Sequence, residues 1–162
     1  MKKEASDLEK LKKEYEKYKI KYNLPNFEKI NEDFEIEKLQ GKETDLFLRE
    51  VRRSIIDKIV AYLRFIETFI NPVNAPLLFL TLIKSLEASE RKSLHELYLR
   101  LGKFEIESVV LDNVYDEKKE SEFIKKIFKE WQETKKEFDK VVQSMMKNME
   151  AKGEMREKGY LG

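Results

Sequence analysis

The segment most informative about the architecture is TDLFLREVRRSIIDKIVAYLRFIETFI (residues 44–70). Its apolar residues recur every three or four positions, which is the period of an α-helix. They are Leu48, Val51, Ile55, Ile59, Tyr62, Leu63, Ile66 and Phe69, flanked by Phe47, Ile56, Val60, Phe65 and Ile70. A helix that is apolar around most of its circumference lies in the middle of a bundle. We therefore predict a central helix from Thr44 or Asp45 to Ile70, ended by Asn71 and Pro72.

The segments before and after this helix are also predicted to be helices. Residues 75–87 are nearly all apolar and predict a second core helix, with Pro76 tolerated in its first turn. Narrower stripes at 6–22, 90–115 and 117–149 predict amphipathic helices that pack around the two, the first and last as a coiled-coil-like pair. The stretch KFEIESVVL (residues 103–111) also alternates like a strand, and both readings stay open. The fold class is all-α: a single-domain bundle of about five helices (residues 1–150) with a long C-terminal amphipathic helix. Residues 151–162 should form a flexible tail.

The composition limits the classes of function. Lys and Arg total 33 against 32 Asp and Glu, a net charge of +1, whereas nucleic-acid-binding domains are usually much more basic. Without cysteine, the chain has no disulfide, no thiolate zinc site and no thiol nucleophile. The charged start lacks the apolar core of a signal peptide, and no long stretch is free of charge, so we expect a cytoplasmic protein and no membrane association.

The sequence also lacks the motifs of metal sites and phosphate-binding loops. His95 stands before Glu96, but Leu99 occupies the place where a zinc-protease helix needs its second histidine. One histidine cannot supply a di-iron site either, and the five glycines never fall in phosphate-loop spacing. We therefore predict no enzyme, no metal and no cofactor, and interpret His95 as a partly exposed helical residue.

The arginines of the central helix admit two interpretations. Arg49, Arg52 and Arg53 could form salt bridges with acids along the helix at 90–115 and just after it, and the three candidate acids are Glu105, Asp112 and Asp116. Alternatively, they could contact phosphate. The lysine-rich first helix, which interleaves its lysines with Tyr15, Tyr18 and Tyr22, would support such RNA binding, although its tyrosines share one stripe as in a packing seam.

The distal end of the last predicted helix is the candidate partner surface. Val142, Met145, Met146 and Met149 close its apolar stripe, and the 33 residues from 117 to 149 exceed the 27 and 26 of its predicted neighbours. The methionines should then project beyond the bundle, and exposed apolar patches mark partner sites. We expect a non-catalytic interaction or scaffold protein that binds another protein or itself. An RNA- or ribosome-associated protein using Arg49, Arg52 and Arg53 is the alternative.

The stretch NLPNFEKINEDFEIEKL (residues 23–39) resembles uncharacterised all-helical proteins of small-genome archaea. This archaeal-like resemblance contains no diagnostic motif and implies no function.

Overall fold

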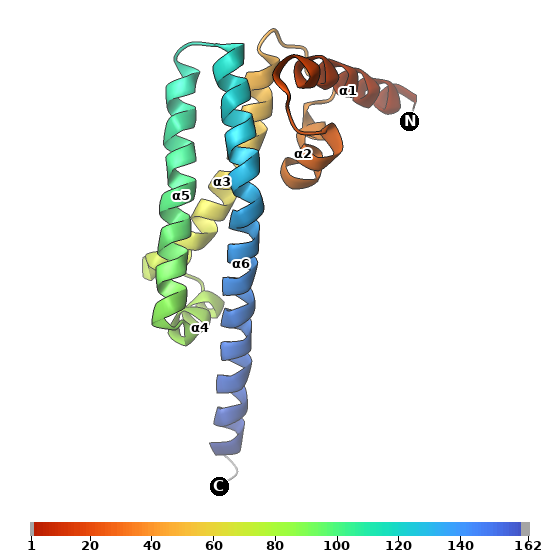
Figure 1. Ribbon diagram of the computed structural model, residues 1–162. Helices are drawn as coiled ribbons and strands as arrows, with labels where there is room; N and C mark the ends of the chain where they lie inside the picture. Colours follow the sequence, from red (N-terminus) through yellow and green to blue (C-terminus); the bar gives the residue numbers. More distant parts are fainter. Residues whose placement is uncertain (1, 160–162) are drawn as a thin grey trace. The chain divides into compact units, whose positions relative to one another are not determined.

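The computed structural model describes the backbone of residues 2–159 and the side chains of residues 7–151. Over this range every element of regular secondary structure is a helix, and there is no strand (Figure 1). The α-helices are α1 (Lys2–Tyr22), α2 (Phe27–Phe34), α3 (Phe47–Ile70), α4 (Leu77–Ser85), α5 (Ala88–Asp112) and α6 (Glu117–Gly159), with short 3-10 helices η1 (Ile36–Leu39) and η2 (Pro72–Asn74). The all-α prediction is confirmed, with six helices instead of five because α2 is a helix of its own. Residues 103–111 belong to α5, so the strand reading is wrong.

The chain divides into two compact units. Unit 1 consists of Met1–Val60 and Phe104–Trp131, and unit 2 of Ala61–Lys103 and Gln132–Gly162. Helices α3, α5 and α6 each contribute residues to both units. The single domain predicted for residues 1–150 stays a prediction.

Unit 1 is built around the first half of α3, where Leu48, Val51, Ile55 and Ile59 are fully buried. The end of α5 and the start of α6 form an antiparallel hairpin, in which the rings of Phe104 and Phe123 lie 6.0 Å apart. The tyrosine stripe of α1 is a packing seam, as expected. The hydroxyl of Tyr15, which is fully buried, donates to the carbonyl of Pro25 at 2.9 Å.

Local sequence signals set the helix ends. Asn23 adopts the left-handed conformation (φ 54°) just before Leu24 and Pro25, where α1 was predicted to stop. The Asp116 side chain accepts a hydrogen bond from the backbone N–H of Lys119 at 3.0 Å and so caps α6. The helical backbone of α6 continues to Gly159, ten residues beyond the predicted end at 149. Of the tail predicted for 151–162, residues 160–162 lie outside the described range.

Unit 2 holds the second half of α3, where Leu63, Ile66 and Phe69 are buried. Here α5 and α6 again lie side by side: Arg100 pairs with Glu137 at 3.1 Å, and the Asn148 side chain donates to Glu90 at 3.1 Å.

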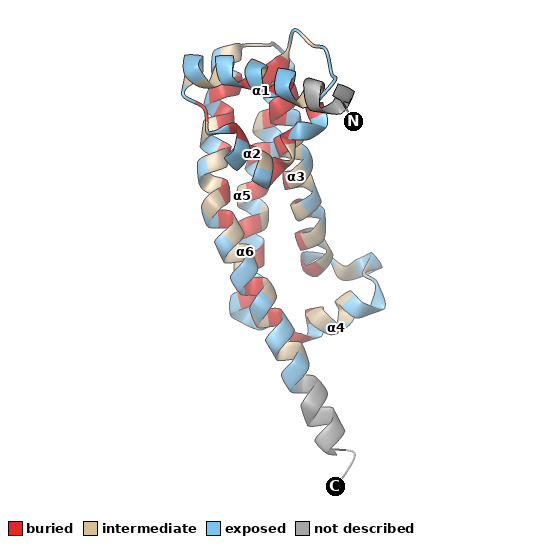
Figure 2. Ribbon diagram, turned by 90° about the vertical axis from the view of Figure 1, so that its right-hand side faces the viewer, coloured by how far each residue is buried: buried red, intermediate tan, exposed pale blue. Residues whose placement is uncertain are grey.

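The interpretation of residues 75–87 as a second core helix is wrong. Helix α4 is nine residues long, and exposed and half-buried positions make up most of it (Figure 2). It contacts α3 through Phe79, whose ring lies 5.4 Å from that of Phe69, and buries Ile83. A helix with one covered face leaves the opposite side chains in solvent, however apolar they are.

Candidate functional site

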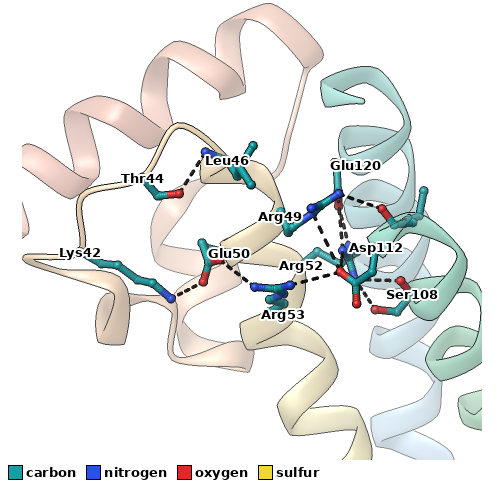
Figure 3. Close-up of polar contacts among 11 residues, drawn as sticks. Lys42, Thr44, Leu46, Arg49, Glu50, Arg52, Arg53, Ser108, Asp112 and Glu120 are labelled. Carbon is teal, nitrogen blue, oxygen red and sulfur yellow. Dashed lines mark hydrogen bonds and ion pairs between the residues drawn. The ribbon is translucent and has the colours of Figure 1, made fainter. Parts of the chain in front are cut away.

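The arginines of α3 meet acids of α5 and α6 inside unit 1 (Figure 3). Arg52 is fully buried, and its Nε donates to Glu120 at 2.6 Å while Nη2 donates to Asp112 at 2.7 Å. Its Nη1 donates to the carbonyl of Ser108 at 3.1 Å and also to the hydroxyl of that residue. Every nitrogen of the guanidinium group is therefore bonded to protein, which is the arrangement of a structural ion pair.

Electrostatics in this cluster favour the charged forms. Burial alone would lower the pKa of Arg52, but its hydrogen bonds to Glu120 and Asp112 outweigh that effect and raise it. The hydrogen bond from Arg52 holds the pKa of Asp112 below its ordinary value. Through its bonds to Asp112 of α5 and Glu120 of α6, Arg52 ties α3 to both arms of the hairpin.

The neighbouring arginines are engaged as well. Arg49 is largely buried; its Nη2 donates to the carbonyl of Leu111 at 3.1 Å, and its guanidinium lies 5.4 Å from the centre of the Tyr115 ring. Arg53 is half exposed but donates to Glu50 at 3.1 Å. These contacts remove the geometric support for Arg49 and Arg52 as phosphate ligands, because their donors already have acceptors in the protein. The RNA alternative itself stays a prediction.

Sequence reasoning identified part of this cluster. Asp112 pairs with the arginines as expected, whereas Asp116 caps α6 and Glu105 is exposed. The main partner, Glu120, was missed. A signal for it existed: Glu120 continues the buried stripe of Ile124, Ile127 and Trp131 by one helical turn, so it had to face the interior.

Five of the six lysines of α1 whose side chains are described also lie in ion pairs. Lys17 pairs with Glu14 at 2.8 Å, and Lys21 pairs with Glu117 of α6 at 2.7 Å. Further pairs are Lys10–Asp7, Lys12–Glu28 and Lys19–Glu16. A helix whose positive charges are matched by adjacent carboxylates offers a weaker phosphate-binding face than its lysine content suggests.

The methionine end of α6 differs from the expected projecting patch. Met145 is only 2% exposed, Val142 and Met149 are half-buried, and Met146 is exposed. The contact between Asn148 and Glu90 explains this, because it brings the first turn of α5 against this part of α6. Burial of Met145 is incompatible with direct partner contact by that side chain.

Among the side chains of unit 2 that the structure describes, the most exposed large apolar ones lie instead between the end of α3 and the first turn of α4. Val73 is 80% exposed, Leu77 82% and Leu78 63%, and Ile70 at the end of α3 is also exposed. We call these four residues the α4 surface. Leucines in solvent at the start of a helix whose other face is packed are not needed for the core, so their burial by a partner would be favourable.

A second apolar stripe lies on α5 and the turn after it, in unit 1. Ile106, Val109 and Val110 are exposed and share one helical face, and Val114 follows in the turn. This face is opposite the buried one formed by Phe104 and Ser108.

Unit 1 also contains a hollow of about 660 Å³ between α1 and residues 39–47. Leu11 and Phe47 are among its lining residues, and both are buried. The lysines at this hollow are paired, Lys10 with Asp7 and Lys42 with Glu50.

Among the residues with described side chains, no group of three or more His, Asp or Glu is placed to hold a metal ion. No described helix is both long and apolar enough to cross a membrane. Comparisons with protein-family models, with curated proteins and with solved structures found no match to this chain.

Proposed function

We propose that this chain is a non-catalytic protein-interaction protein that binds a partner protein through the α4 surface. The observation that carries the proposal is the exposure of Val73, Leu77 and Leu78 within one short segment. Burying a leucine side chain contributes about 1.5–3 kcal/mol, so two or three such residues supply the central anchors that protein interfaces use.

The proposal accounts for a local conflict in the fold. The segment from Leu77 to Ile83 is the most apolar of the chain, yet Ile83 is its only buried residue, and Phe79 is the residue whose ring contacts α3. Sequences usually place polar residues on the solvent face of such a helix. Leucines there indicate a second binding face.

The test compares partners recovered by tagged protein from its native cell, by affinity purification and mass spectrometry with and without nuclease. Leu77→Ser/Leu78→Ser should keep the helicity and melting of the wild type but lose its specific partners. Leu99→Ser is the matched control, because Leu99 is an exposed leucine of the same unit outside the α4 surface. This control should recover the wild-type partners.

Two results would overturn the proposal. Recovery of the same proteins by wild type and Leu77→Ser/Leu78→Ser would show that the α4 surface is not the interface. Loss of all partners after nuclease treatment would favour the RNA-associated alternative.

A further inference from the structure

A small apolar cavity with a basic rim lies in unit 2, at one edge of the α4 surface. It has a volume of about 170 Å³ and is lined by Phe69, Ile70, Leu86, Arg91, Leu94 and His95. Ile70 belongs both to this cavity and to the α4 surface. A partner that covers the α4 surface would therefore meet the cavity as well.

The floor and the rim of the cavity differ in chemistry. Phe69, Leu86 and Leu94 are buried and form an apolar floor. Arg91 and His95 are exposed, lie one helical turn apart on the same face of α5, and form the basic rim. No carboxylate lines this cavity.

One residue of the rim, Arg91, is held by a hydrogen bond to the protein backbone. Arg91 Nη2 donates to the carbonyl of Ile83 at 2.8 Å, which anchors the side chain at the C-terminal end of α4. One nitrogen of the guanidinium group is thus held by the protein, and none of the ion pairs among the described side chains involves Arg91. An arginine held in this way presents its remaining donors to an incoming carboxylate with little further loss of side-chain freedom.

We infer that the cavity receives an acidic amphipathic segment of the partner protein, an inference that rests on the proposed function. One apolar side chain of the segment enters between Phe69, Leu86 and Leu94. An Asp or Glu about one helical turn away pairs with Arg91 and His95. The cavity is smaller than the roughly 300–1,000 Å³ of ordinary small-molecule sites, so it suits a side chain instead of a metabolite.

The test selects binders from a display library of random twelve-residue peptides on the full-length protein. Peptides enriched on the wild type should combine an apolar residue with Asp or Glu within four positions. Peptides enriched on Arg91→Glu/His95→Glu should lose these acids and gain Lys or Arg. A wild-type peptide should bind the charge-reversed variant at least about tenfold more weakly, with the difference shrinking at high salt.

Lys92→Glu is the matched control, because Lys92 neighbours Arg91 in the sequence but does not line the cavity. It should select the same peptides as the wild type. Enrichment of apolar peptides with no preference for acids would overturn this inference and leave the proposed function standing. Leu77 and Leu78 do not line the cavity, so peptides that bind the cavity should also bind Leu77→Ser/Leu78→Ser. The proposed function fails separately, if that variant recovers the same partner proteins as the wild type.

A membrane surface is the competing acidic occupant, and the same variants distinguish it. The wild type should stay in the supernatant when phosphatidylserine vesicles are sedimented. Co-sedimentation that is lost in both Arg91→Glu/His95→Glu and Leu77→Ser/Leu78→Ser would assign the surface to lipid and overturn the inference.

Discussion

Replacing Arg52 by methionine tests whether the buried ion network stabilises unit 1. The substitution keeps an unbranched apolar stem but removes the donors that Glu120 accepts at 2.6 Å and Asp112 at 2.7 Å. Glu120, fully buried, then keeps only the longer contact with Arg49 Nε at 3.5 Å. Removing one partner of a buried ion pair costs about 3–5 kcal/mol, because the remaining charge stays desolvated. For a chain of this size the melting temperature should fall by roughly 6–20 °C.

Fluorescence of Trp131 during urea unfolding measures this loss. It is the single tryptophan of the chain, belongs to unit 1 and packs 5.5 Å from the Phe34 ring, so its signal reports that unit. Arg53→Met is the matched control: the same substitution on the same helix at a side chain that is 51% exposed should cost about 1 kcal/mol or less.

The double variant Arg52→Met/Glu120→Met, compared with Arg52→Met and Glu120→Met alone, completes a double-mutant cycle. Removing both charges should leave unfolding within about 1–2 kcal/mol of the wild type, because no unpaired buried charge remains. The ion pair does not stabilise unit 1 if Arg52→Met costs no more than Arg53→Met. The same conclusion follows if the loss in the double variant equals the sum of the losses in Arg52→Met and Glu120→Met.

Burial and charge also set the expected effect of substitutions elsewhere in the chain. Ile59→Ala, at a fully buried site of α3, should lower the free energy of unfolding by about 2–5 kcal/mol in urea; a loss below about 1 kcal/mol would show that α3 is not central. Met145→Lys should lower the melting temperature clearly, because it buries a charge, whereas the exposed Met146→Lys should leave it nearly unchanged by circular dichroism. The pKa of Asp112 is lowered in the fold, so its stabilising effect exists above the unfolded value of about 3.9 and is lost as pH falls through the lower folded value. Asp112→Asn should therefore destabilise the protein at pH 7 but not at about pH 2, and an equal difference at both pH values would contradict this.

The helices and most of their ends follow from local features of the sequence. A three-to-four-residue apolar period is a property of one segment, and so is the turn at Asn23 and Pro25 or the cap at Asp116. The buried face of α3 could also be predicted, because a helix apolar around most of its girth is stable in water only when neighbours cover it.

Only the tertiary structure decided which of the other apolar and charged residues are covered. Leu77 and Met145 are both apolar residues on predicted helices, yet Leu77 lies in solvent and Met145 is buried. In the sequence, Glu120 is one of many acids on a charged helix. The structure places Arg52 beside it and so identifies its partner. Burial depends on which segments lie against each other in space, whereas periodicity reports only which residues share a face of their own helix.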